Sequence, residues 1–427
     1  MKLPKRWRAP IAGLALFSWP AWAGAQGTES LTLEEALRRS GALGVEQAEM
    51  ANPRVVAPQQ DVAAAEALVG QAGLRPNPEV SLEVENVAGT GPYNGFEQAE
   101  TTVGLSIPIE LGGKRSARIA VADAQSNRAL LMAAITQADN RLQVTQFYVE
   151  AVAAQRRLAT AQDQLRITRE AANAARVRVQ AGRASPLEEQ RADVARVNAE
   201  AGVERAQRLA EVARSNLARR VGQPIAGPLD ETALDRLPAA DYGPAQPTDA
   251  AGTLALAAAD ANLAVADAGV RLARSQRMPD LTVGPGIRRL EATNDTAAVF
   301  SISMPIPLFN SGRAAVEQAT AERHRAEAQR RMTALDVEQA IAEAEAEAAN
   351  AATTARAANG PALAAAQEAA RIARIGYREG KFGQLDLLDA ERTLADTRLA
   401  AIDALAAYQN ARAQLERLTA PAPEEGN

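Results

Sequence analysis

The sequence predicts a mostly α-helical fold with a small β part, arranged as a two-fold internal repeat. The first indication is composition. Ala, Arg, Glu, Gln and Leu dominate the 427 residues, only 3% are aromatic, and cysteine is absent. This mixture favours long helices over a thick aromatic core. The other indications are two long helical runs and four short segments in which apolar and polar residues alternate, as they do in strands.

The two halves of the chain carry the same motifs in the same order. SIPIELGGKRSARIAVADA, which begins at Ser106, matches SMPIPLFNSGRAAVEQATA, which begins at Ser303. QAGRASPLEEQRADVARV, from Gln180, aligns with REGKFGQLDLLDAERTLA, from Arg378. Such a long period is not that of a short-repeat solenoid. We therefore expect a first structural repeat over 26–220 and a second over 251–418, joined by a Pro- and Gly-rich connector at 221–250.

The N-terminus has the pattern of a secretory signal. Four basic residues lie among the first eight, an apolar run follows between Pro10 and Pro20, and the small residues of AWAGA come next. The run is shorter than the roughly 20 residues that a membrane-spanning helix needs. We expect cleavage after Ala23 or Ala25, so that residues 1–25 form a signal peptide. No cysteine follows the cleavage site, so we expect no lipid anchor.

The charge of the mature chain argues against some classes of partner. Removing the signal leaves 43 basic residues (47 minus 4) against 52 acidic ones, a formal charge of −9. A mildly acidic chain does not favour nucleic-acid binding, which depends on neutralising phosphates. The mature sequence has no apolar run of transmembrane-helix length, so a membrane role would fall to the strands.

The alternating segments predict four strands of membrane-crossing length. In the first, Val80, Leu82 and Val84 alternate with polar residues. Strands of about 9 to 11 residues suit a tilted crossing of a bilayer. Four strands leave two sheet edges unpaired, and closed membrane barrels start at about eight strands, so we expect oligomerisation. For any one strand the alternative is a small soluble sheet with one wet face. The expected strands are 79–88, 99–109, 280–290 and 297–307.

The helical runs are far longer than globular helices. We expect long helices at 113–181 and 312–380, the second interrupted only by Gly360-Pro361, and shorter helices at 186–220 and 385–418. At 1.5 Å per residue each long run would span roughly 100 Å. Small residues on several faces suit a helix packed between neighbours in a sheath. The last residues, 419–427, have a composition that predicts a disordered tail.

The sequence shows no constellation typical of catalysis. The single histidine, His324, sits in a helical stretch, and no carboxylate cluster has metal-ligand spacing. PIELGGKRS, from Pro108, lacks the spacing of a phosphate-binding loop and is better explained as a strand-to-helix corner. We therefore predict that the protein is not an enzyme and has no cofactor and no bound metal.

On these residues the chain resembles the outer-membrane efflux channels of the TolC family. The resemblance covers essentially the whole mature chain and rests on the repeat, the paired strands, the P-x-x-x-x-G corners and the two turns at Gly182 and Gly380. NPEVSLEVENVAGTG, ETTVGLSIPIELGGKRSAR and YREGKFGQLDLLDAERTL are similar to the cobalt–zinc–cadmium (CzcC-like) heavy-metal efflux branch of that family.

The resemblance implies a homotrimer in the outer membrane. Three copies of four strands would form a twelve-stranded transmembrane β-barrel, continued by a long periplasmic α-helical barrel with an equatorial belt around the 221–250 connector. The turns at 181–187 and 379–385 would meet a periplasmic adaptor protein, which links to an inner-membrane pump of the RND type. The implied adaptor-contacting residues are Gly182, Ser185, Pro186, Leu187, Gly380, Gly383 and Leu385.

The resemblance also implies a gate at the periplasmic end of the channel. Asp386 and Asp389 match acids that line the narrow entrance, and three copies would give two rings of three carboxylates. Helix capping, worth about 0.3–1 kcal/mol, is the other explanation for acids at this place. Tyr377 and Glu188 match residues that lock the closed entrance. The family's arginine is absent, since Phe382 stands at its position.

The function that follows is a passive exit duct of a tripartite efflux system, conducting divalent heavy-metal cations. Two alternatives remain open from the sequence. One is a duct for organic toxins or for type I protein secretion. The other, from a different class, is a soluble periplasmic coiled-coil scaffold.

Overall fold

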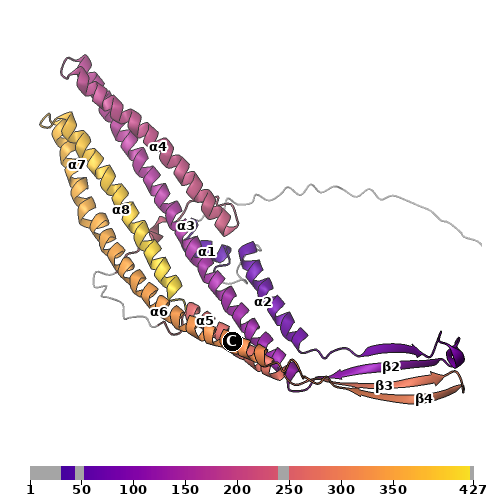
Figure 1. The fold of residues 1–427 in the computed structure, drawn as a ribbon. Coiled ribbons are helices and arrows are strands. Elements are labelled where there is room, and N and C mark those ends of the chain that lie inside the picture. The colour runs from indigo at the N-terminus through magenta and orange to yellow at the C-terminus, as the bar shows by residue number, and fades with distance from the viewer. Residues whose placement is uncertain (1–29, 44–51, 239–249, 424–427) are drawn as a thin grey trace, which may run out of the picture.

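The computed structural model describes residues 30–43, 52–238 and 250–423. The signal peptide expected at 1–25 lies outside these residues. Two long helix pairs lie side by side and lead, at one end, into a four-stranded sheet (Figure 1). In chain order the main elements are α1 Leu33–Arg39, α2 Pro53–Ala72, β1 Glu79–Glu85, β2 Glu100–Ile109, α3 Lys114–Gln180, α4 Pro186–Val221, α5 Leu254–Ser275, β3 Leu281–Leu290, β4 Asp295–Ser303, α6 Arg313–Ala357, α7 Leu363–Arg378 and α8 Gln384–Leu418.

Both strand-to-helix corners depend on glycine. The residues before α3 and α6, Gly113 and Gly312, have φ angles of 72° and 70°. This left-handed conformation is open to glycine but costly for residues with a Cβ. From these corners α3 continues for 67 residues without interruption, which at 1.5 Å per residue is about 100 Å.

The second long helix, expected over 312–380, is divided at Gly360-Pro361, the one interruption that the sequence predicts. A π-helical turn at Ala358–Ala362 separates α6 from α7, and within it Gly360 has φ −101° and ψ −105°. Pro361 has no N–H to donate and its ring displaces the preceding turn, so the ladder of backbone hydrogen bonds shifts by one residue there. The two segments otherwise continue in one direction (Figure 1).

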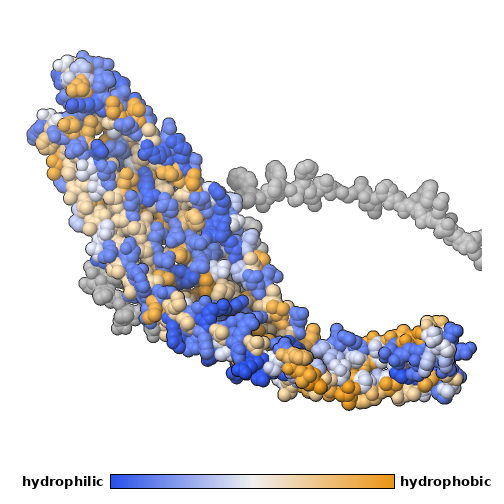
Figure 2. Space-filling model, in the orientation of Figure 1, coloured by the Kyte–Doolittle hydropathy of each residue, from blue (hydrophilic) through white to orange (hydrophobic). Residues whose placement is uncertain are grey.

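The four strands form one antiparallel sheet in chain order. Cross-strand pairs such as Val80 with Leu105 and Val103 with Ile287 place apolar side chains on one face, which we call the apolar face. Its residues are largely exposed, for example Val80 at 76% and Phe300 at 66%. Figure 2 shows apolar side chains gathered over the strands. The opposite, polar face carries serine, threonine, glutamate and arginine.

Two strands differ in extent from the sequence prediction. β1 ends at Glu85 and not at 88, because Asn86 and Ala88 take positive φ angles of 58° and 57° that leave the β region. β4 runs from Asp295 to Ser303 and not from 297 to 307. Pro305 and Pro307 cannot donate to a ladder, so pairing stops before them. β2 and β3 lie within one residue of the predicted bounds.

The principal core lies midway along the helices, where both helix pairs and the connector meet. Leu217 of α4 and Leu405 of α8 are buried there, together with Leu229 and Leu234 of the connector. Backbone hydrogen bonds of 2.8 Å from Leu31 N–H to the Pro228 carbonyl and 2.9 Å from Asp230 N–H to the Leu31 carbonyl fix the connector to the N-terminal segment. The described part of the 221–250 connector is therefore part of the core.

The C-terminal residues are not a free tail, although the sequence analysis expected disorder over 419–427. Leu254 N–H donates to the Ala420 carbonyl at 3.0 Å, and Ala422 N–H donates to the Gly252 carbonyl at 2.9 Å. These bonds order the segment against the start of α5. The expectation of disorder is wrong for residues 420–422, and residues 424–427 lie outside the described part.

Tyr148 carries the polar contact at the centre of this core. Its side chain is 1% exposed, and its hydroxyl lies 2.8 Å from the carbonyl oxygens of both Leu31 and Asp230. Tyr148→Phe removes this donor and leaves buried carbonyls without it, so we expect a loss of about 1 kcal/mol of stability. Thermal unfolding followed by circular dichroism in detergent measures it. Tyr93→Phe, at a 49% exposed tyrosine, is the control, and equal melting of the two variants would contradict the assignment.

Within the described residues, no helix combines the length and the apolar character needed to cross a membrane.

Candidate functional site: the tips of the helix pairs

The sequence-predicted site residues gather at the end of the helix pairs far from the sheet (Figure 1). The first tip, residues 181–187, turns at Gly182 with φ 67°, and Ser185 caps α4 by accepting the Leu187 N–H at 3.3 Å. The second tip, residues 379–385, turns at Gly380 with φ 71°. Pro186 occupies the first turn of α4, where its missing N–H costs nothing. Both tips are therefore tight turns.

Asp386 and Asp389 lie on the first turns of α8, both exposed. Asp386 accepts the Gly383 N–H at 2.9 Å and so caps the helix. This satisfies one of the N–H groups that every helix start leaves unpaired. Among the described residues, Asp389 accepts no such backbone N–H. The two acids predicted as one pair thus differ: Asp386 caps α8, and the Asp389 side chain is exposed beside the tip.

Tyr377 contacts Arg178, an arginine that was not predicted from the sequence, and Glu188 acts on the same arginine through its charge. The guanidinium of Arg178, at the end of α3, lies over the Tyr377 ring, 5.4 Å from its centroid. The Tyr377 phenol, and more weakly the Glu188 carboxylate, hold the pKa of Arg178 above its ordinary value. The phenol oxygen is buried and makes no aligned hydrogen bond, so we treat the contact as cation–π.

Arg178 joins the two helix pairs at the tips. It stands four residues before Gly182, where the second repeat has Gly376 four residues before Gly380. The cation of this cluster therefore comes from the first tip, although the sequence analysis looked for it at Phe382 of the second. A comparison of the two repeats position by position could have singled out Arg178, because only one repeat carries a charge there.

Phe382 has a packing role in the second tip. Its ring lies against the backbone of Gly376, so closely that a Cβ at position 376 would collide with ring carbons. The N–H groups of Lys381 and Phe382 both donate to the Gly376 carbonyl, at 2.8 and 3.2 Å. An aromatic ring on a glycine thus stabilises the turn, while 43% of the Phe382 side chain stays exposed.

A buried ion pair holds α7 to α8 behind this tip. Glu391 is 1% exposed and accepts from Arg374, with a second Arg374 N–H to Glu391 Oε2 distance of 2.7 Å. Close by, Arg398 of α8 reaches Asp163 of α3 at 2.7 Å. These contacts tie the second helix pair together and link it to the first.

At the other end of the molecule the polar face of the sheet is acidic. Glu85 and Glu100 are direct cross-strand partners, and Arg288 bonds to both, at 3.1 and 2.8 Å. Like charges placed opposite each other destabilise a sheet, and the arginine offsets this. Glu79 and Glu83 lie on the same face, so the face carries four glutamates, two of which bond to Arg288.

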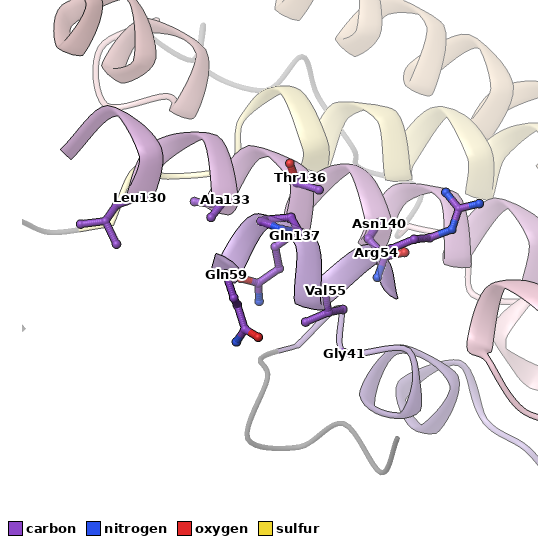
Figure 3. Close-up of a pocket in the computed structure, with 11 residues that line it drawn as sticks. Gly41, Arg54, Val55, Gln59, Leu130, Ala133, Thr136, Gln137 and Asn140 are labelled. Atoms are coloured by element: carbon purple, nitrogen blue, oxygen red, sulfur yellow. The ribbon is translucent and has the colours of Figure 1, made fainter. Parts of the chain in front are cut away.

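Other features of the surface do not form a chemical site. A crevice of about 190 Å³ between α2 and α3, lined by Arg54, Gln59, Gln137 and Asn140, is a packing gap (Figure 3). His324 is exposed on α6. Among the described residues, no group of three or more His, Cys, Asp or Glu is placed to hold a metal ion.

Comparison with known proteins identifies the family. The family model described as "Outer membrane efflux protein" matches residues 44–223 and 250–420. The cobalt-zinc-cadmium resistance protein CzcC of Cupriavidus metallidurans is 30% identical over 391 residues, covering 91% of this chain and 90% of that protein. The nickel and cobalt resistance protein CnrC of the same organism is 31% identical over 277 residues, covering 64% of this chain and 66% of that protein.

Solved structures agree in fold. A membrane protein from Pseudomonas aeruginosa superimposes with a TM-score of 0.76 at 21% identity, covering 99% of this chain and 98% of the other. The open state of the MtrE outer membrane channel of Neisseria gonorrhoeae gives 0.73 at 20% identity, covering 91% and 88%. The predicted TolC-like fold is confirmed, and the soluble-scaffold alternative is wrong. The chain belongs to the outer membrane efflux protein family: it is a non-enzymatic channel protein of the outer membrane that extends into the periplasm.

Proposed function

We propose that the chain is the outer-membrane exit duct of a tripartite efflux system of the RND type, and that it conducts divalent heavy-metal cations. The observation that carries the proposal is the sheet, with its exposed apolar face and its two outer strands, β1 and β4. In a bilayer every unpaired backbone group costs several kcal/mol, so these edges must be closed. Three copies supply twelve strands, enough for a barrel, with the polar face lining the pore.

The metal cargo is supported by charge and by the relatives. CzcC and CnrC are named as resistance proteins for cobalt, zinc, cadmium and nickel. The polar face of the sheet carries four glutamates, two of them bonded to Arg288, and a trimer would repeat this acidic lining three times. Rings of carboxylates attract cations and repel anions. The choice among metals is assigned to the inner-membrane pump.

The two tips are the proposed docking points for a periplasmic adaptor. Leu187 at the first tip and Leu385 at the second are 55% and 66% exposed, beside Phe382. Exposed apolar side chains at the end of a helix pair suit packing against the hairpin of another protein. The residues proposed for this contact are those of the sequence analysis, Gly182, Ser185, Pro186, Leu187, Gly380, Gly383 and Leu385.

The proposed gate is the ring of acids beside the second tip. Three copies would place three Asp389 carboxylates around the axis, above the three Asp386 carboxylates that cap α8. Arg178 would hold each second helix pair closed through Tyr377, with Glu188 of the first pair beside it, in the place of the missing family arginine.

For the N-terminus, we propose that residues 1–25 are removed as a signal peptide and that no lipid is attached.

Growth in the presence of toxic compounds tests the cargo. A strain that lacks this gene should become sensitive to zinc, cobalt or cadmium salts, and the intact gene should restore growth. Sensitivity to dyes and detergents is measured in parallel. Protection against organic compounds alone would favour the alternative duct, and protein secretion that depends on the gene would favour a type I system.

Planar-bilayer recording tests the gate. Asp386→Ala with Asp389→Ala should raise single-channel conductance and weaken block by multivalent cations, because both carboxylate rings are lost. Asp389→Ala alone leaves the Asp386 cap in place and should still weaken the block. Asp396→Ala, at an acid ten residues farther along α8, is the control. If conductance and block stay unchanged in the double variant, the gate assignment is wrong although the fold stands.

A further inference from the structure

Two helices lie at the edges of the helical layer with a neighbour on one side only. Across the layer the order is α6 and α7, then α8, then α3, then α4 (Figure 1). α8 packs against both α3 and the α6–α7 helix, and α3 packs against both α8 and α4. By the internal repeat, α4 corresponds to α8, and α6–α7 corresponds to α3.

The edge helix α4 buries far fewer residues than α8, its equivalent in the second repeat. α8 buries twelve of its 35 residues, whereas α4 buries five of 36. Val212 of α4 is 55% exposed, while its repeat equivalent Asn410 of α8 is half-buried with an enclosed side-chain oxygen. The face of α4 that corresponds to a covered face of α8 is therefore exposed to solvent in the single chain.

The contact between α3 and α8 supplies a template for what covers it. Arg417 of α8 donates to the Asp139 carboxylate of α3. Asp139 follows the corner glycine Gly113 by 26 residues (139 − 113), and Glu338 of α6 follows the corner glycine Gly312 by the same 26 (338 − 312). The acidic partner of this ion pair, Asp139, therefore has an acidic equivalent, Glu338, in the second repeat.

The basic partner of the ion pair, Arg417, has a basic equivalent in the first repeat. Arg417 follows the turn glycine Gly380 by 37 residues (417 − 380), and Arg219 of α4 follows Gly182 by 37 (219 − 182). Both Glu338 and Arg219 are exposed. Arg219 donates to the Ser215 hydroxyl at 3.1 Å, and within the described residues Glu338 takes part in no ion pair. They lie at opposite edges of the layer and cannot meet within one chain.

We propose that α4 of one copy packs against α6–α7 of a second copy in the register of the α3–α8 contact, with Arg219 paired to Glu338 of that copy. This inference rests on the proposed trimer and adds its residue register. The same surface on each copy then meets its complement on the next, a head-to-tail contact that closes into a ring.

A second ion pair between α3 and α8, nearer the tips, has no oppositely charged equivalent in the repeat. Arg157 pairs with Asp403 at 2.8 Å within the chain, but their repeat equivalents are Arg356 and Arg205, both cations. The Nε of Arg356 is enclosed by atoms of its own chain, where a second copy does not reach it. The register therefore rests on the pair of Arg219 with Glu338 and not on this second pair.

Chemical cross-linking tests the register, because the natural chain contains no cysteine. Arg219→Cys with Glu338→Cys, treated with a short bis-thiol reagent in the detergent-solubilised protein, should give covalent dimers and trimers on a denaturing gel. Asp139→Cys with Arg417→Cys should give only a cross-linked monomer. Arg219→Cys with Glu345→Cys is the matched control, shifted two helical turns, about 10.5 Å, along the same face.

Charge reversal gives an independent readout. Arg219→Glu or Glu338→Arg alone should lower the temperature at which the solubilised trimer dissociates, and the two together should restore it. Suppose that the Arg219→Cys/Glu345→Cys variant cross-links and the Arg219→Cys/Glu338→Cys variant does not, or that the single charge reversals have no effect. Either result would overturn the register and leave the proposed function intact. A wild-type protein that is monomeric in detergent by light scattering would overturn both.

Discussion

Replacing Arg374 by Ala is expected to destabilise the second helix pair by about 3 kcal/mol, because it leaves a buried carboxylate without its partner. Glu391 is 1% exposed, and the only charged group bonded to it among the described residues is Arg374. The side chain of Arg374 is 42% exposed, which places the expected loss at the lower end for buried pairs. Thermal unfolding of the detergent-solubilised protein, together with protease sensitivity of the second tip, measures the effect.

The control for this prediction removes both charges. Arg374→Met with Glu391→Leu replaces the pair by apolar side chains of similar size, and it should recover most of the stability lost in Arg374→Ala. Arg371→Ala, at an exposed i,i+3 pair with Glu368 on the same helix, should cost little. If Arg371→Ala and Arg374→Ala melt alike, burial of Glu391 is not what makes the pair important.

The second large effect is expected in the sheet, where Gly286→Ala should disturb the pairing of β2 with β3. A Cβ at position 286 would lie 2.9 Å from the Val103 carbonyl oxygen and 3.3 Å from the Gly104 Cα. Both atoms belong to the backbone of the neighbouring strand, so the strands must move apart. Overpacking of this kind costs about 1–3 kcal/mol. The yield of oligomer from outer-membrane fractions, run unheated on a gel, measures it.

The cross-strand partner of Gly286 provides the matched control. Gly104 pairs with Gly286 directly, but a Cβ at position 104 would meet only the Ser81 hydroxyl oxygen, at 2.9 Å. A hydroxyl can rotate to another rotamer, whereas backbone cannot yield without losing its hydrogen bonds. Gly104→Ala should therefore assemble almost normally. Equal loss of oligomer in both variants would show that glycine is needed at this pair for some reason other than contact with backbone.

The candidate site was only partly predictable from sequence. The positions of Asp386 and Asp389 near the second tip follow from Gly380 and Gly383, which mark the turn before α8. Asp386 caps the helix because it accepts the Gly383 N–H, and Asp389 does not. For both acids the sequence left two explanations open, a channel gate and helix capping. Arg178 was missed, because its partner Tyr377 lies on the other helix pair and no local pattern connects the two.

By itself the sequence determined the two-fold repeat, the four strands, the long helices and the places of the two turns. These depend on side-chain periodicity and on glycine or proline at particular positions, which act over a few neighbouring residues. Only the tertiary structure decided the order α6–α7, α8, α3, α4 across the layer, the burial of Glu391 and the ordering of residues 420–422. Each of these depends on which surfaces distant in the chain exclude water together, and periodicity within one segment carries no information about its neighbour.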